Sequence, residues 1–279
     1  MPGTASASPT STRRRRERSD SREAGLNPID PTARERFDRL DALRGAAIFW
    51  MAAFHLCFDL NLYGLMPAQN FYRDPFWLNQ RTGIVTMFLF CAGLAQAVAL
   101  QGEAGRGEGL AARFSPRFWR RWAQVAGCAV LVSLGSAVMF PKSWISFGVL
   151  HGIAVMLILA RLVAPAGRWV WAIGALALAV PQVFRHPWFN QPFAHWTGLV
   201  TKKPITEDWV PVLPWLGVVL LGLAAGRWLL AHRREVLAGS VPSALAPLAV
   251  LGRWSLTFYM THQLVFLGVI VGGRQLGWW

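Results

Sequence analysis

Charged side chains are scarce in this chain. They make up 15% of its 279 residues, whereas hydrophobic residues make up 54%. A soluble domain of this length usually carries about a quarter charged residues. The composition therefore excludes an ordinary soluble domain and indicates a membrane protein.

Acidic residues are few as well, 14 against 28 basic ones, which gives a formal net charge of +14. Such an excess can indicate a nucleic-acid-binding protein. Here, however, ten of the basic residues precede residue 45 and most of the others flank apolar runs. We therefore expect no nucleic-acid partner and interpret the basic residues as marks of membrane topology.

Cysteine is nearly absent. Cys57, Cys91 and Cys128 are scattered, and each falls inside an apolar run. Neither a disulfide pairing nor a metal-ligand spacing is visible. We expect no metal cofactor and interpret the three side chains as small groups that face lipid or other helices.

The first 36 residues lack the apolar side chains that a folded core needs. They are polar and basic, which predicts a disordered tail that contacts anionic lipid headgroups. A signal peptide does not fit, because the following apolar run is too long and no cleavage site is visible. We expect a cytoplasmic tail over residues 1–36 and a transmembrane domain over residues 37–279.

Seven apolar segments follow the tail, each near the ~20 residues that span a bilayer. They predict an all-α, polytopic transmembrane bundle of about seven spans. The fifth is the shortest and contains Pro181, which ends or kinks a helix. The segments are 42–64, 82–101, 120–140, 145–163, 168–184, 210–231 and 249–272.

The basic residues are unevenly divided between the two sides of such a bundle. With the N-terminus inside, 21 of them fall on the inner side and seven on the outer side. Cytoplasmic loops carry the excess of Lys and Arg. The sequence therefore predicts an N-terminus inside and a C-terminus outside.

The first apolar segment contains three ionisable groups on one helix face. His55 lies eleven residues after Arg44, about three turns and about 16 Å further along a helix, and Asp59 follows one turn later. Ionisable groups inside a span are costly and usually functional. A carboxylate that orients an imidazole makes it a better general base, so we expect His55 to be catalytic with Asp59 as its partner.

Other polar groups are predicted at similar depth. His262 lies near the middle of the last segment, where Tyr259 and Gln263 share its polar stripe, and His151 lies in the outer half of the fourth. We expect the histidines to converge with Asp59 near the membrane centre. Interhelical hydrogen bonding without chemistry is the alternative for each histidine alone.

A cluster of arginines precedes the third segment, in the run RFSPRFWRRWAQ. Arg117 and Arg120 share one helix face, and Arg121 adjoins them. Such a cluster commonly anchors the inner end of a span. Alternatively, it binds phosphate groups, for which guanidinium forks are well suited.

The longest loop after the tail joins the fifth and sixth segments and is rich in Trp, Phe, His and Pro. Aromatic residues there indicate a belt at the membrane boundary. The alternative is a platform for a sugar or a lipid headgroup.

These motifs carry a family resemblance. The run LDALRGAAI, with His55 eleven residues after its arginine, resembles the opening motif of the membrane acyltransferase-3 superfamily. Other stretches are similar to bacterial relatives of the heparan-alpha-glucosaminide N-acetyltransferase catalytic domain, and the similarity runs from about residue 36 to 272. They are HLCFDLNLYG, FGVLHGIAVMLIL, DWVPVLPWLGVVLLG and LGRWSLTFYMTHQ.

The resemblance implies a multi-pass acyltransferase of the bacterial cytoplasmic (inner) membrane, with acetyl-CoA or a longer acyl-CoA as donor. It implies that Arg44 and His55 are essential and that Arg117 and Arg120 contact the donor. The acceptor would be an extracytoplasmic sugar or glycan. A homo-oligomer remains open.

The leading hypothesis gives His55 the role of base or acyl carrier. The oxyanion would be stabilised by His262, Gln263 or Tyr259. The acceptor would be bound by His151, Asp208, Trp215, Tyr259 and Gln263. The alternatives are a proton-coupled transporter that uses the His/Asp relay, and a catalytically silent membrane scaffold.

Overall fold

The computed structural model describes Gly3, residues 36–104 and residues 109–278. The tail predicted to be disordered lies almost wholly outside these residues, so that prediction stays untested. Residues 36–278 belong to one compact unit, and only that unit is described below.

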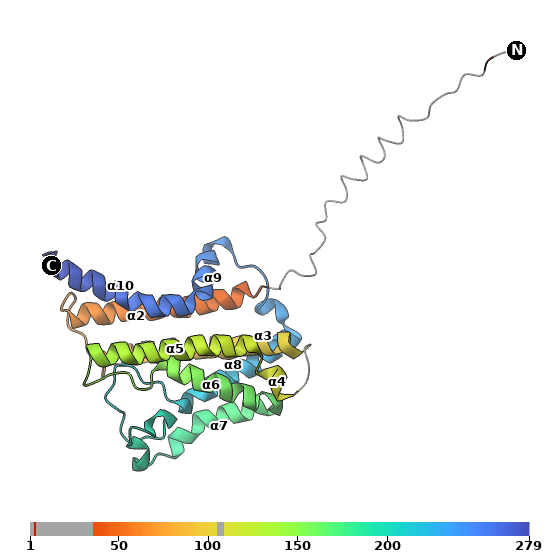
Figure 1. Ribbon diagram of the computed structural model, residues 1–279, viewed down its shortest axis with the longest axis horizontal. Helices are drawn as coiled ribbons and strands as arrows, with labels where there is room; N and C mark the ends of the chain where they lie inside the picture. Colours follow the sequence, from red (N-terminus) through yellow and green to blue (C-terminus); the bar gives the residue numbers. More distant parts are fainter. Residues whose placement is uncertain (1–2, 4–35, 105–108, 279) are drawn as a thin grey trace. The chain divides into compact units, whose positions relative to one another are not determined.

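All regular elements in the described residues are helices, which confirms the all-α bundle (Figure 1). Six of the helices are long and apolar enough to cross a membrane. These six are α2 (Asp38–Leu62), α3 (Pro75–Ala104), α5 (Pro116–Met139), α6 (Val149–Val163, extended by the 3-10 turn Ala164–Ala166), α8 (Val212–His232) and α10 (Ser255–Gln275). The shorter helices are α4 (Leu110–Arg113), α7 (Trp169–Val183) and α9 (Ala246–Arg253).

Helix α7 corresponds to the fifth predicted segment and has 15 residues. Its length of about 22 Å is less than the ~30 Å of a bilayer core. At one end, the α7–α8 loop bonds to the α5–α6 turn through Glu207 N–H and the Ser143 carbonyl, at 2.9 Å. At the other, Arg227 near the end of α8 donates to the Ala164 carbonyl just before α7, at 2.6 Å. Helix α7 therefore runs from one end of the bundle to the other, although it is shorter than the six candidate spans of the described residues.

Two ends of the bundle can thus be distinguished. The basic end contains the starts of α2 and α5 and the ends of α3, α6 and α8. The loop end contains the connections 63–74, 140–148 and 184–211. The start of α2 and the end of α10 lie at opposite ends (Figure 1).

The core lies between α3, α6 and α8. Leu89, Met156 and Leu220 are fully buried there. Helices α3 and α8 pack with almost no space between their backbones: a Cβ on Gly93 would collide with the Val219 carbonyl oxygen. Small residues at such positions let helices approach closely, which is how helices associate in lipid.

The last predicted segment, 249–272, is divided. Helix α9 ends at Arg253, Trp254 leaves the helical conformation, and α10 begins at Ser255. Helix α9 packs against the first half of α2, where a Cβ on Gly45 would meet the Leu248 carbonyl. Because of this break the last span starts later than predicted, and Arg253 belongs to α9.

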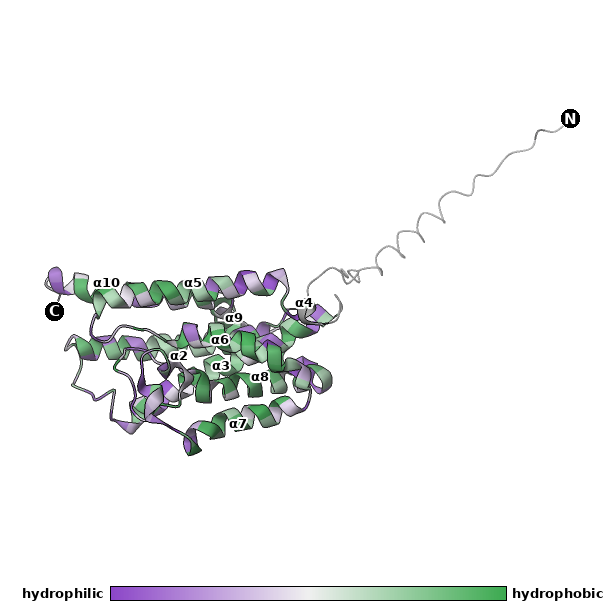
Figure 2. Cartoon of the chain, turned by 60° about the horizontal axis from the view of Figure 1, so that its bottom comes forward, coloured by the Kyte–Doolittle hydropathy of each residue, from purple (hydrophilic) through white to green (hydrophobic). Residues whose placement is uncertain are grey.

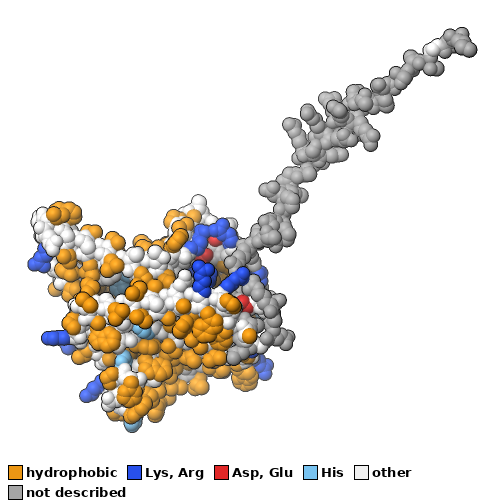
Figure 3. Space-filling model, in the orientation of Figure 1, with side chains coloured by type: hydrophobic (Ala, Val, Ile, Leu, Met, Phe, Trp, Pro, Cys, Tyr) orange, Lys and Arg blue, Asp and Glu red, His pale blue; other side chains and the backbone are white. Residues whose placement is uncertain are grey.

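The outer surface suits a lipid environment. Hydrophobic residues run along the helices, and hydrophilic ones gather at helix ends and in the loops (Figure 2). On the face in Figure 3, hydrophobic side chains cover most of the surface, and Lys and Arg lie toward its ends. Val138 and Val183, for example, are 84% and 85% exposed.

Candidate active site

Two histidines meet between the first and last spans. His55 Nδ1 on α2 lies 2.9 Å from His262 Nε2 on α10. The two rings are stacked, with centroids 5.1 Å apart and planes at 17°. His262 is buried and His55 is half-buried. Two of the three histidines expected to converge therefore do so.

The backbone of α10 determines which nitrogen carries each proton. His262 Nδ1 lies 2.8 Å from the Tyr259 carbonyl oxygen and 3.2 Å from that of Phe258. Carbonyl oxygens only accept, so His262 Nδ1 carries a hydrogen, and in the neutral ring Nε2 is an acceptor. His55 Nδ1 therefore donates to His262, which leaves a lone pair on His55 Nε2. Among the described residues, His55 Nε2 has no hydrogen-bond partner.

Asp59 has a different partner from the one predicted. Its carboxylate is 1% exposed, and both of its oxygens accept from Gln263 Nε2 at 2.8 Å. The predicted Asp59–His55 pairing is therefore wrong, because α10 supplies a partner to each of the two groups on α2. Gln263 thus holds the Asp59 carboxylate through its amide nitrogen, whereas its Oε1 is buried without a partner in the described part of the chain.

Two residues expected at the acceptor site instead hold the α5–α6 turn. His151 Nδ1 accepts from the Gly148 N–H at 3.3 Å, and its Nε2 lies 3.2 Å from Ser133 Oγ. Asp208 accepts from the Val149 N–H at 2.6 Å and so stabilises the start of α6. No hydrogen bond or ring contact with the His55–His262 pair is found for His151 in the described residues.

Asp208 lies outside the spans, in the α7–α8 loop. Burial raises the pKa of its carboxyl, and the Val149 N–H together with the charges of Arg81 and Lys203 partly offsets this. Burial likewise lowers the pKa of Lys203, and the nearby Arg81 adds to the effect.

Tyr259 and Trp215 both pack against the core between α3, α6 and α8. The Tyr259 ring also lies next to that of His262, with centroids 6.0 Å apart. Tyr259 is therefore close to the histidine pair, whereas the structure gives Trp215 a packing role.

The predicted donor residues lie at the basic end. Arg117, Arg120 and Arg121 are exposed on the first turns of α5 and form no ion pair with any described residue. Arg44 is half-buried on α2 and pairs with Asp41 at 2.9 Å. These three guanidinium groups of α5 are thus unpaired within the described part of the chain, and Arg44 remains about three helical turns from His55.

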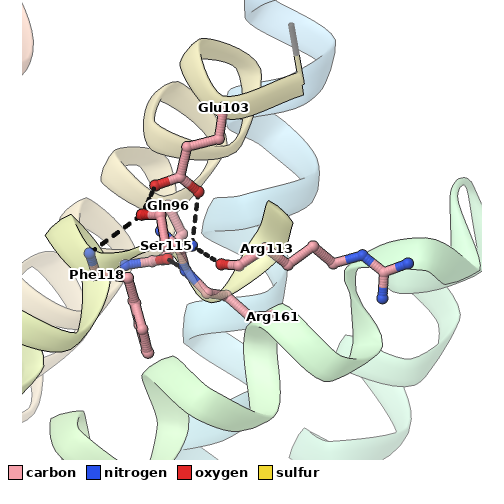
Figure 4. A network of polar contacts seen from close by, with 6 residues as sticks. All are labelled: Gln96, Glu103, Arg113, Ser115, Phe118 and Arg161. Carbon is pink, nitrogen blue, oxygen red and sulfur yellow. Dashed lines mark hydrogen bonds and ion pairs between the residues drawn. The ribbon is translucent and has the colours of Figure 1, made fainter. Parts of the chain in front are cut away.

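Sequence reasoning missed a buried ionic network at this end (Figure 4). Arg161 on α6 is 2% exposed and donates to Glu103 Oε2 and Gln96 Oε1, each at 2.7 Å. It also donates to the Arg113 carbonyl, and Ser115 Oγ donates to Glu103 Oε1 at 2.7 Å.

Ser115 is the N-cap of α5 and accepts from the Phe118 N–H. The network therefore joins α3, α4, α5 and α6 and fixes where the arginine-bearing helix begins. The sequence did contain a sign of this network: Arg161 lies inside the apolar segment 145–163, and an ionisable group inside a span requires a partner.

No group of three or more His, Cys, Asp or Glu that could hold a metal ion is found in residues 36–104 and 109–278.

A family model described as heparan-alpha-glucosaminide N-acetyltransferase, catalytic, matches residues 36–264. The match includes both paired groups of α2 and their partners on α10. No curated protein and no solved structure matches the chain.

Proposed function

We propose an activity from one premise: the chain belongs to the heparan-alpha-glucosaminide N-acetyltransferase catalytic-domain family. The family and the apolar helices indicate a membrane acetyltransferase. We infer that its donor is cytoplasmic acetyl-CoA, or a longer acyl-CoA. The acceptor in this proposal is the hydroxyl or amine of an extracytoplasmic sugar or glycan, and the enzyme lies in the bacterial cytoplasmic membrane.

The observation that carries the proposal is that Nε2 of His55 has no hydrogen-bond partner within residues 36–104 and 109–278. The hydrogen bond to His262 holds the ring and keeps the proton on Nδ1, so the lone pair on Nε2 is available for chemistry. His262 is held in turn by the backbone of its own helix. A general base held in position by a second group can activate a weak nucleophile such as a hydroxyl or an amine.

His55 Nε2 serves two routes equally well. As a base, it removes the proton from the acceptor while the acceptor oxygen or nitrogen bonds to the thioester carbon. The carbon–sulfur bond then breaks, and His55 returns the proton to the leaving thiolate. As an acyl carrier, Nε2 itself bonds to the carbonyl carbon and the thiolate leaves. The acceptor oxygen or nitrogen then bonds to that carbon, the carbon–Nε2 bond breaks, and the acceptor's proton passes to the thiolate.

Support for the donor side comes from the basic end. Arg117, Arg120 and Arg121 are exposed without ion pairs among the described residues, so their guanidinium groups are available to phosphates. The Arg161 network fixes the start of their helix. Placement of this end in the cytoplasm follows the excess of basic residues there.

Transfer of labelled acetyl from acetyl-CoA to glucosamine by the purified protein in lipid nanodiscs tests the proposal. We expect His55→Ala to lower turnover by ~10²-fold or more, which is the usual effect of removing a general base. His232→Ala is the matched control, because His232 is an exposed histidine at the end of α8. Equal turnover in wild type and His55→Ala would remove His55 from the mechanism.

Donor binding separates this function from a transporter. Coenzyme A should bind saturably, and Arg117→Ala combined with Arg120→Ala should weaken its affinity at least ~tenfold, since charge-assisted bonds contribute about 1.5–3 kcal/mol each. Arg168→Ala, an exposed arginine before α7, is the control. A transporter that uses the His55–His262 pair for protons would show no such arginine-dependent affinity.

A further inference from the structure

A pocket of about 360 Å³ lies at the loop end, where α2 leaves the bundle. The end of α2 and the following connection 63–74 form it. Its lining is Phe58, Asn61, Leu62, Ala68, Gln69, Asn70, Phe71 and Tyr72. No lining side chain is a carboxylate, an ammonium, a guanidinium or an imidazole.

Aromatic rings form one side of this pocket. The Phe58 ring lies edge-on to two others. Its centroid is 5.3 Å from that of Phe71, with the ring planes at 87°, and 6.2 Å from that of Tyr72, with the planes at 85°. Phe71 is 4% exposed and stacks on Trp77 with ring centroids 4.0 Å apart. The rings are therefore held in place before any ligand arrives.

Amide groups form the rim, and their own bonds fix them. The Asn61 side chain bonds to both the N–H and the carbonyl of Gln69, at 2.7 and 3.2 Å. Asn70 Oδ1 accepts from the N–H groups of Tyr72 and Arg73, at 3.2 and 3.0 Å. In the described chain no partner is found for Asn70 Nδ2 or the Tyr72 hydroxyl, so both can bond to a ligand.

The Tyr72 hydroxyl stays a donor at neutral pH. Partial burial raises the pKa of its phenol, and the charge of Glu207 adds to this while Arg81 opposes it. The rim thus offers neutral donors and acceptors in fixed positions, which reduces the entropy lost when a ligand binds.

The pocket lies close to the histidine pair. The Phe54 ring packs against both the His55 ring and the Phe71 ring, with ring centroids 6.0 and 5.6 Å away. Phe58 and Leu62 follow His55 by three and seven residues, so they point within about 60° of it and lie about 4.5–10 Å further along α2.

We propose that this pocket binds an uncharged, hydroxyl-rich ring: the neutral sugar unit of the acceptor, next to the unit that reacts. The connection to His55 rests on the proposed function. Aromatic faces pack against the C–H groups of such a ring, and amides and phenol bond to its hydroxyls. The lining itself contains no cationic side chain to pair with a carboxylate, sulfate or phosphate, so a charged ring loses water there without a direct partner, which makes it a poorer ligand than a neutral one.

Binding is measured without any acyl donor, so failure of acetyl transfer would leave the result intact. Saturation-transfer NMR on the full-length protein in nanodiscs compares glucose with glucuronate and glucose 6-phosphate. Glucose should bind saturably, and the two charged analogues should bind at least ~tenfold more weakly, because the lining residues include no cationic side chain to pair with them.

Two variants assign the signal to the pocket. Phe58→Leu keeps a large apolar side chain but removes a ring face, and should weaken glucose binding ~tenfold. Asn70→Asp keeps the Oδ1 bonds but removes the amide donor, and should weaken binding several-fold, roughly the value of one hydrogen bond.

The matched control is Asn190→Asp. Asn190 Oδ1 likewise accepts from two loop N–H groups, those of Thr201 and Lys202, but lies outside the pocket. It should bind glucose like the wild type. The proposal is overturned if none of the three sugars binds, if a charged analogue binds as tightly as glucose, or if Phe58→Leu and Asn70→Asp bind like the control.

Discussion

Replacement of His262 tests whether this residue orients His55. In His262→Phe the ring keeps its packing between Phe258 and Phe266, whose centroids lie 5.9 and 5.8 Å away, but the acceptor at Nε2 is lost. His55 Nδ1–H is then left without its partner. An unmade hydrogen bond of this kind costs about 1–3 kcal/mol.

If that cost falls on the conformer in which Nε2 faces the substrate, kcat falls about 5- to 160-fold, since each 1.36 kcal/mol is tenfold in rate. The KM for acetyl-CoA should not change, because the proposed donor residues lie at the basic end of the bundle, on the first turns of α5 and at Arg44 of α2. The assay is acetyl transfer in nanodiscs, with thermal unfolding measured on the same samples.

His262→Gln distinguishes orientation from packing. A glutamine offers an amide oxygen as acceptor, so it should recover part of kcat, whereas a residue needed only for packing would show no recovery over phenylalanine. A folded His262→Phe protein with kcat within about twofold of wild type would refute the reasoning.

Three further predictions concern stability, each measured by thermal or denaturant unfolding in detergent. Arg161→Met leaves the Glu103 carboxylate buried and uncompensated and should lower the free energy of unfolding by about 3–5 kcal/mol. Arg168→Met on the surface should lower it little, and equal effects of the two variants would contradict the role of the network. Gly93→Ala should destabilise through collision with α8, by about 1–3 kcal/mol, whereas Gly127→Ala has open space; a neutral Gly93→Ala would contradict the close packing. Burial raises the pKa of Asp208, so the folded state binds more protons than the unfolded state, and stability falls as pH rises from the ordinary pKa of 3.8 through the raised value. Asp208→Asn should remove this loss, and an unchanged pH profile would contradict it.

Sequence patterns predicted the bundle well. Apolar length located the six helices that are long enough to cross a membrane and the shorter α7, because a bilayer demands about 20 apolar residues at each crossing. The pattern could not locate the break at Trp254, since no proline lies there and the apolar character continues across it. The start of α6 was also placed four residues early, because the stabilising Asp208 is 59 residues away in sequence.

The sequence pointed to the polar residues that meet between α2 and α10, but not to the way in which they pair. Helical periodicity places Asp59 one turn from His55, and that proximity favoured a pair on one helix. The actual partners, His262 and Gln263, lie on α10, more than 200 residues away. Such pairs depend on how two helices are rotated against each other, which single-helix periodicity does not determine.

The buried Arg161 illustrates the same limit. Counting it as a marker of topology was consistent with the charge bias but ignored the cost of a charge within an apolar helix. Its partners come from α3 and α4, which adjoin α6 only in the folded bundle.

The most direct test of the central claim is chemical rescue at His55. Single-turnover acetyl transfer is measured for His55→Gly with and without added imidazole. If the His55 imidazole performs the chemistry, the variant loses ~10²- to 10⁴-fold in rate and imidazole restores part of it. A His55→Gly protein that transfers acetyl at the wild-type rate without imidazole would contradict the account.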